Sequence, residues 1–450
     1  MDESQVKASA RAIMPEIMDE LGTLVSHASC EFPGFPPEPV HAARAQVIRM
    51  FKNAGLEVSE LDLEGGGYPA VWGEIPAPEG APTVLLYGHY DVQPAPMEQG
   101  WLTDPWTPTM KDDGRMYGRG AADDKSGPAI HAGTLRVFGG KPPVGVKVII
   151  EGEEETISQL EAFVENHPER FKADCMIIAD MGNIECGQPV LTTMLRGHCQ
   201  CTVEVRTIDH PLHSGVFGGP VPDAFVALIR LLSNLWDDRG NTIVPGLEGF
   251  DWPGADYPEP LIREMAGVLP GVEIVGDASV GSMLWSRPNA TVLGIDGVPS
   301  IAEAGNVLLP VASAKVALRI APGADPEAEI TKLMGYLRAC APWGVQVDVH
   351  EVKASDAFIA PKGGPAMAAA AEALKAAYGV EPSEVGSGGS IPLLETLMKA
   401  SPGAEFILLG AEDAKANIHG ANESVHPDEI ERMIVAQALL IQALANRATG

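Results

Sequence analysis

Short, almost continuous apolar runs constrain the fold of this chain more than any other feature of its sequence. Three of them lie at residues 83–87, 146–150 and 176–179, and a fourth lies far along the chain at 406–409. Runs of this kind are typical of strands that other elements cover on both faces. Helical periodicity occurs around them, at residues 5–21, 41–54, 365–378 and 427–445. We therefore expect an α/β domain in which helices cover a central sheet.

The middle of the chain has a different pattern. Residues 198–206 alternate strictly, with Cys199 and Cys201 on the apolar face, as in a half-exposed strand of an antiparallel sheet. Helix, strand, strand, helix and strand are then expected, at residues 222–236, 290–295, 315–320, 326–340 and 345–352. This order is ferredoxin-like, and it predicts a smaller α+β domain inserted at 196–356. The larger domain is then discontinuous and comprises residues 1–195 and 357–450.

The charge and composition of the chain exclude several classes of protein. It has 61 acidic and 31 basic side chains, and its formal net charge of −30 repels phosphate backbones and anionic lipids. We therefore expect no nucleic acid and no membrane as partner. No stretch reaches about 18 consecutive apolar residues, no signal-peptide core is present, and the six cysteines form no C-x-x-C pair. These features predict a soluble, reduced, cytoplasmic protein.

Acidic side chains and a histidine follow three of the apolar runs. His89 and Asp91 come after the first run, glutamates within 151–155 after the second, and Asp180 after the third. Asp123 lies between the first two runs, in the sequence GRGAADDKSG. Ligands of open α/β sheets bind outside the carboxyl ends of the strands, so these groups are expected to converge. Packed carboxylates need a cation, and imidazole with carboxylate suits zinc, manganese or cobalt rather than calcium.

Each of these pieces also has an ordinary explanation. A single His-x-Asp after a strand is usually a capped turn, a run of glutamates is usually a solvated helix start, and Asp-Asp-Lys is usually a turn. Their occurrence together, at the ends of three strands, favours a site. A phosphate-binding loop is excluded, because Asp124 stands before Lys125 where that motif requires glycine.

Six motifs occur in one order along the chain: GHYDVQP (88–94), GRGAADDKSG (118–127), EGEEET (151–156), HSGVFGG (213–219), GGSIP (388–392) and IHGANES (418–424). Together they resemble the co-catalytic zinc exopeptidases, which include carnosinase-type dipeptidases, glutamate carboxypeptidase, aminoacylase and the acetylornithine and succinyl-diaminopimelate deacylases. The resemblance covers nearly the whole chain and is strongest toward the dipeptidase branch. It implies a large domain with a mixed central sheet covered by helices, and a smaller inserted domain through which two chains form a homodimer.

The resemblance implies two divalent metal ions per chain that share one carboxylate, with zinc as the first choice and manganese or cobalt as alternatives. The family's ligands correspond to His89 and Asp180 at the first ion, Glu155 and His419 at the second, and Asp123 between them. A cis peptide bond between Asp123 and Asp124 is also implied.

Two further residues correspond to the family's general base and to the residue that orients a metal-binding histidine. Glu154 matches the general base, which takes a proton from a metal-activated water and returns it to the leaving amine. Asp91 matches the residue that hydrogen-bonds the first imidazole ligand and fixes its orientation. Ile157 replaces a glycine that is usual in the family, so the choice among Glu153, Glu154 and Glu155 depends on the preserved E-E-x-x-S spacing.

The resemblance also implies a set of substrate-binding residues. His213 matches a histidine that reaches across the dimer to the substrate carbonyl, and Asn306 matches an amide or hydroxyl position. Arg319 would clamp the free carboxylate of the substrate bidentately. Gly389 and Ser390 would add backbone and hydroxyl contacts to the same carboxylate.

The function predicted from these residues is hydrolysis of the amide bond in dipeptides or short peptides. A carboxypeptidase or an N-acyl amino acid deacylase would use the same metal ions on another substrate. A catalytically silent metal-binding protein would keep the ligands without activity, and the intact Glu154 argues against it. The Pro- and Gly-rich segment at 240–288 is expected to shape the substrate preference.

Overall fold

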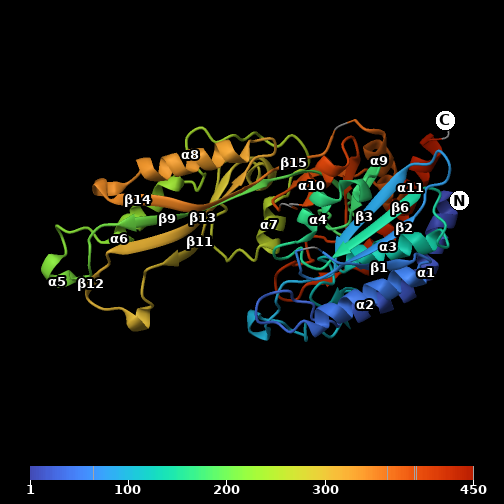
Figure 1. The fold of residues 1–450 in the computed structure, drawn as a ribbon, viewed down its shortest axis with the longest axis horizontal. Helices are drawn as coiled ribbons and strands as arrows, with labels where there is room; N and C mark the ends of the chain where they lie inside the picture. Colours follow the sequence, from blue (N-terminus) through green and yellow to red (C-terminus); the bar gives the residue numbers. More distant parts are fainter. Residues whose placement is uncertain (64, 362, 390, 392, 449–450) are drawn as a thin grey trace.

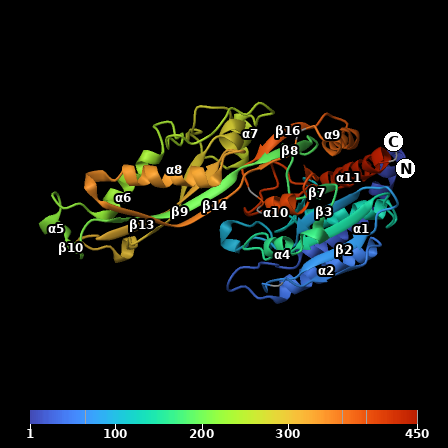
Figure 2. The same cartoon turned by 45° about the horizontal axis from the view of Figure 1, so that its top comes forward.

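The computed structural model describes residues 1–448 except 64, 362, 390 and 392, and it has an elongated shape with two bodies (Figure 1). The larger body is an α/β structure that holds both termini. The smaller body is an antiparallel sheet with two helices, and it extends away from the larger one (Figure 2). A single residue, Arg196, separates a strand of one sheet, which ends at Leu195, from a strand of the other, which begins at Gly197.

Among the described residues, nine strands form the sheet of the larger body. Along the sheet they are β1 (Val58–Leu61), β2 (Ala70–Ile75), β6 (Gly145–Glu151), β3 (Thr83–His89), β7 (Cys175–Ile178), β17 (Glu405–Leu408), β8 (Val190–Leu195) and β15 (Phe358–Ile359), with β16 (Ser383–Ser387) paired to β8. The four predicted strands are β3, β6, β7 and β17, which are parallel neighbours. Because β2 and β8 join them antiparallel, the sheet is mixed, as predicted.

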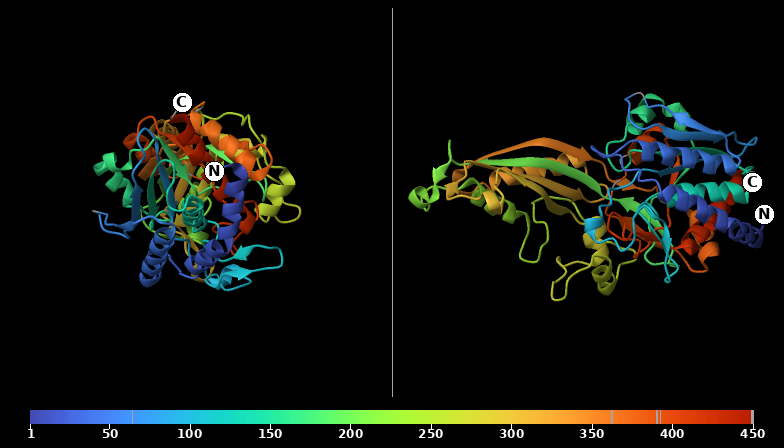
Figure 3. Two further views of the ribbon diagram at one scale, coloured as in Figure 1. Left: turned by 90° about the vertical axis from the view of Figure 1, so that its right-hand side faces the viewer. Right: turned by 90° about the horizontal axis from the view of Figure 1, so that it is seen from below.

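Helices cover both faces of this sheet (Figure 3). One face carries α1 (Glu3–Val25), α2 (Glu38–Asn53), α3 (Ser126–Val137), α9 (Pro365–Tyr378) and α11 (Pro427–Ala448). The other face carries α4 (Leu160–Asn166), η2 (Pro168–Phe171) and α10 (Leu393–Ala400). The four predicted helices correspond to α1, α2, α9 and α11. The sequence did not predict α3, because every residue of it except Arg136 is buried and it has no polar face.

The smaller body has the predicted order of elements. Its strands, in sheet order, are β11 (Asn289–Asp296), β13 (Val311–Ile320), β9 (Gly197–Arg206) and β14 (Gln346–Ser355), and all neighbours are antiparallel. The helices α6 (Ala224–Leu232) and α8 (Pro326–Ala339) pack on one face. Cys199 and Cys201 are buried in that core, as the alternation predicted. These elements all lie within 197–355, and we retain 196–356 as the proposed extent of the domain.

Short elements complete the described chain: η1 (Met97–Gln99), β4 (Thr109–Met110), β5 (Met116–Tyr117), β10 (Leu212–His213), α5 (Ser214–Phe217), η3 (Ser233–Leu235), α7 (Glu259–Met265), η4 (Ser282–Ser286), η5 (Ile301–Glu303), β12 (Val307–Leu308), η6 (Pro342–Gly344) and β18 (Ser424–Val425). The segment at 240–288, which includes α7 and η4, packs on the larger body through Trp252 and Trp285 against Val190 and Val385. Within the described part of the chain, no helix is both long and apolar enough to cross a membrane.

Candidate metal centre

Three neighbouring strands deliver the predicted ligands to one edge of the large sheet. His89 is the last residue of β3, Asp180 follows β7, and Glu155 follows β6. Because β6, β3 and β7 are parallel neighbours, their carboxyl ends open on the same side. Loops bring the other two residues: Asp123 precedes α3, and His419 lies between β17 and β18.

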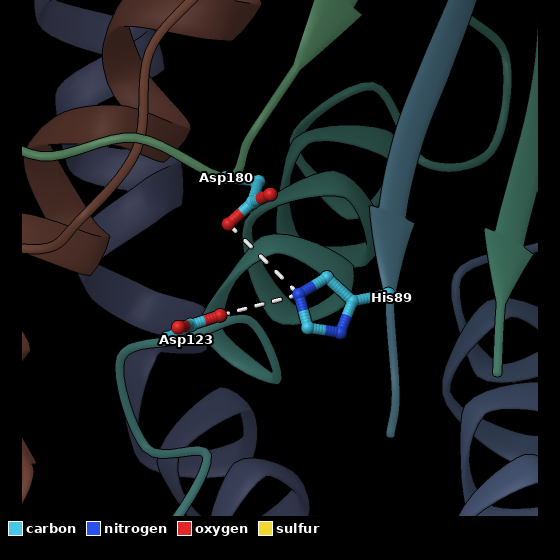
Figure 4. Close-up of side chains that lie close together, drawn as sticks. All are labelled: His89, Asp123 and Asp180. Carbon is cyan, nitrogen blue, oxygen red and sulfur yellow. Dashed lines mark hydrogen bonds and ion pairs between the residues drawn. The ribbon is translucent and has the colours of Figure 1, made fainter. Parts of the chain in front are cut away.

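The first group comprises His89, Asp123 and Asp180 (Figure 4). His89 is fully buried, and its Nε2 lies 3.2 Å from Oδ1 of Asp123 and 3.9 Å from Oδ1 of Asp180. Its other nitrogen, Nδ1, lies 3.1 Å from the backbone oxygen of Asp91 and 3.4 Å from the Asp91 carboxylate. An Nδ1–H that donates to Asp91 leaves Nε2 as the nitrogen that faces the carboxylates.

The second group comprises Asp123, Glu155 and His419. Nε2 of His419 lies 3.0 Å from Oδ2 of Asp123 and 3.3 Å from Oε2 of Glu155. Asp123 therefore offers Oδ1 to one group and Oδ2 to the other. The peptide bond between Asp123 and Asp124 is cis, which confirms that expectation.

The donor atoms of these two groups suit small divalent cations. In each group they lie within 4.8 Å of one another. Two ligands bound to a tetrahedral zinc ion at about 2.0–2.2 Å are roughly 3.3–3.6 Å apart, close to the separations seen here. Imidazole nitrogen and carboxylate oxygen are both ligands that zinc accepts. We refer to His89, Asp123, Glu155, Asp180 and His419 together as the metal cluster.

The electrostatics of the metal cluster also favour a cation. Burial raises the pKa of Asp180 well above its ordinary value, and neighbouring carboxylates add to this effect. Hydrogen bonds to Asp123 and Glu155 raise the pKa of His419 to about 10. Burial works against the ionised form of Asp123, yet hydrogen bonds to His419 and His89 hold its pKa below the usual range. Protons on the two imidazoles balance the carboxylates here, so a metal ion and protons compete for the same nitrogens.

Glu154 lies beside the metal cluster without belonging to either group. Burial is the main cause that raises its pKa to about 8; the positive charge of His89 opposes this rise, and the charges of Asp91 and Glu155 contribute to it. Its backbone N–H donates to Asp91, which fixes the start of the loop. The carboxylate of Glu153, in contrast, accepts the backbone N–H groups of Tyr68 and Gln159 and is held there.

A buried ion pair ties the two ligand-bearing loops together. Oε1 of Glu423 accepts the backbone N–H groups of Ala122 and Asp123 at 3.0 and 3.1 Å. Its Oε2 pairs with Nη1 of Arg119 at 2.6 Å, and Nη2 of Arg119 donates to the backbone oxygen of Gly420. Both side chains are almost completely buried. The sequence predicts no role for Arg119, because its partner lies about 300 residues away in the chain.

The metal cluster opens into a cleft of about 700 Å³. Arg319, Gly388 and Gly389 line the cleft together with Glu154 and members of the metal cluster. The segment at 240–288 adds Tyr257, Met265 and Trp285 to the wall. No periodic signal marks these three residues in the sequence, since the segment is irregular. Ser390, another predicted substrate residue, lies outside the described residues.

The strand β10, which ends at His213, and the strand β12, which follows Asn306, lie with α5 at the end of the smaller body that is farthest from the larger body (Figure 1). We call this region, which comprises β10, α5 and β12, the tip. His213 on β10 pairs with Val307 of β12, and its Nδ1 accepts the backbone N–H of Gly215. The backbone oxygen of Asn306 accepts the N–H of Ser214. The structure thus brings these two predicted residues next to each other, but not to the cleft of their own chain.

Comparisons with known proteins agree on one family. Residues 85–443 match the model of peptidase family M20/M25/M40. The chain is 40% identical over 437 residues to a cysteinylglycine-S-conjugate dipeptidase of Corynebacterium striatum, with 94% of each chain covered. It is 30% identical to a Cys-Gly metallodipeptidase of Schizosaccharomyces pombe, with 89% of each covered. The crystal structure of human carnosine dipeptidase 1 matches with a TM-score of 0.84 at 25% identity, covering 99% of both chains.

Proposed function

The chain belongs to peptidase family M20/M25/M40 and is a metallodipeptidase, and on this premise we propose that it hydrolyses dipeptides at a pair of zinc ions. The observation that carries the two-ion proposal is the shared carboxylate of Asp123, which offers one oxygen to each group of the metal cluster. His89 and Asp180 would hold one ion, and Glu155 and His419 the other. Manganese or cobalt would suit the same donors.

When bound, the ions would lower the pKa of a water molecule and polarise the carbonyl of the scissile amide. Glu154 is the general base in this proposal: it accepts a proton from the water and gives it to the nitrogen of the leaving amine. A raised pKa and a position in the wall of the cleft suit that exchange. Asp91 keeps the imidazole of His89 oriented, with its proton on Nδ1.

Arg319 and Gly389 would bind the free carboxylate of the substrate, since both line the cleft. We include Ser390 in this proposal on the basis of its motif alone. The names of the relatives suggest small substrates such as cysteinylglycine, its S-conjugates and β-alanylhistidine. The walls formed by Tyr257 and Trp285 would contact the substrate side chains.

His213 and Asn306 would act in the cleft of a second chain, so we propose a homodimer joined through the smaller body. Exposed apolar side chains on α6 and β11 support this assembly: Val226, Ile229, Leu293 and Ile295 are each about half exposed. All six cysteines are free thiols, which suits the proposed cytoplasmic location.

The test is metal analysis coupled to a substrate panel. Purified protein would be stripped with a chelator, reloaded with zinc, manganese or cobalt, and assayed on dipeptides, N-acetyl amino acids and longer peptides. Metal-dependent turnover of dipeptides above the other substrates supports the proposal. Preferential turnover of N-acetyl amino acids would assign the chain to deacylation, and absence of any amide hydrolysis in metal-loaded protein would refute it.

A further inference from the structure

Arg196 occupies the single position between the two sheets. Leu195 ends β8 of the large sheet and Gly197 begins β9 of the small one (Figure 2). The backbone N–H of Arg196 donates to the oxygen of Ser387 at the end of β16. Two residues later, His198 pairs with Arg319 of β13. Arg196 therefore lies between the small sheet and the loop at 387–389, and the loop residues Gly388 and Gly389 line the cleft.

The guanidinium of Arg196 is buried without a counter-ion. The residue is 7% exposed, and among the residues that the structure describes no carboxylate forms an ion pair with it. Within the described part of the chain, its Nε has no hydrogen-bond partner, and Nη1 makes a long contact of 3.4 Å with the backbone oxygen of Met283. A buried charge of this kind is costly unless an anion neutralises it.

A second guanidinium lies close by. Burial and then the charge of Arg319 lower the pKa of Arg196 to about 10, so the group remains protonated at neutral pH. Nη2 of Arg196 lies directly behind Gly388, where a Cβ atom would come within 3.0 Å of it. Gly388 and Arg319 both line the cleft. One positive charge, that of Arg319, thus lines a cleft that is also lined by carboxylates, and a second, that of Arg196, lies next to Gly388 in the same wall.

We propose that Arg196 is a positioning residue of the carboxylate subsite, which acts from behind Gly388 and, with Arg319, selects substrates that have a free C-terminal carboxylate. This inference rests on the proposed function, and it assigns the missing counter-ion to the substrate. A carboxylate held at Gly388 and Gly389 would neutralise both guanidinium groups in a region of low dielectric. Because Arg196 joins the two sheets, the same carboxylate would link the larger body to the smaller one.

The test compares cysteinylglycine with cysteinylglycinamide, which lacks the terminal negative charge, on the zinc-loaded enzyme. Wild type is expected to prefer the free acid. Arg196→Met should raise KM for the acid by about tenfold with little change in kcat, because one of two buried positive charges is lost. The constants for the amide should stay unchanged, and Arg196→Lys should recover part of the loss in KM.

Arg206 provides a matched control, since it is an exposed arginine at the other end of β9. Arg206→Met also removes one positive charge and should leave the acid-to-amide ratio as in wild type. Equal kcat/KM for acid and amide in wild type would overturn the inference, and so would an equal loss on both substrates in Arg196→Met.

Arg196→Gln is the second variant if Arg196→Met does not fold. Loss of folding in both would show that the fold itself requires the arginine, and would overturn a role confined to the substrate. Failure of the proposed function has a different signature, because wild type would then hydrolyse neither the acid nor the amide.

Discussion

The metal cluster and the tip differ in how far their predicted site residues are buried and fixed by neighbouring side chains. In the metal cluster, His89 is fully buried, and the Arg119–Glu423 pair fixes the loops on either side. At the tip, His213 is exposed, and its Nδ1 accepts a local hydrogen bond from the backbone N–H of Gly215. The difference teaches that one chain brings together the residues proposed to bind the ions, whereas in the proposed dimer His213 would act in the cleft of a second chain.

The largest effect is expected at Glu154. Replacing it with glutamine removes the proposed base, and kcat should fall by roughly a thousandfold while the zinc content stays unchanged. Steady-state kinetics and metal analysis of the same preparation measure both quantities. Glu153→Gln is the matched control, because that carboxylate is held by Tyr68 and Gln159 and its variant should keep near-normal kcat. Loss of zinc from Glu154→Gln would contradict the role given to it.

His213→Ala should lower kcat by roughly a hundredfold, since one donor to the substrate carbonyl is lost, again without loss of zinc. Mixing this variant with Glu154→Gln tests the comparison most sharply. In a mixed dimer, one cleft would combine an intact Glu154 with an intact His213 from the other chain. Activity should therefore reappear when two nearly inactive proteins exchange subunits. Absence of any recovery in demonstrated mixed dimers would contradict a shared site.

Glu423→Gln should weaken zinc binding by about tenfold, because Arg119 loses its buried partner and the loop of Asp123 is held less firmly. Competition with a chromophoric chelator measures the affinity. Glu20→Gln is a suitable control, since Glu20 pairs with Arg136 on the outer helices and does not contact either ligand loop. An unchanged affinity in Glu423→Gln would mean that the ion pair serves the fold alone.

The smallest effect is a pH dependence that belongs to the metal cluster alone. The pKa of His419 is raised to about 10 in the folded protein, against about 6.5 in an unfolded chain. Its protonation therefore stabilises chelator-treated protein fully below about pH 6.5, and this contribution is lost as the pH rises toward 10. The melting temperature should fall over that range in chelator, and less so in His419→Asn. An identical fall in both proteins would contradict this assignment.

Much of the fold and the metal cluster could be predicted because the signals are local. Buried strands appear as apolar runs, and His89, a group of glutamates and Asp180 follow those runs directly. The choice of Glu155 among the glutamates depended on the family resemblance. The roles of Arg196 and Arg119 could not be predicted in the same way. Each role depends on residues that are distant in the sequence and come close only in the folded chain. Tyr257 and Trp285, which line the cleft, belong to a segment without hydrophobic periodicity, so the sequence did not predict their position.

The place of β17 in the large sheet has a consequence for synthesis. This strand comprises residues 405–408, yet in the sheet it lies between β7 and β8. Both of those strands are synthesised more than 200 residues before β17. Until β17 arrives, β7 has an unpaired edge, and an emerging chain must keep that edge from joining another chain. The inserted domain can fold during this interval, because its four strands are already available. The metal cluster is therefore completed only after all strands of the inserted domain have been synthesised, when His419 leaves the exit tunnel.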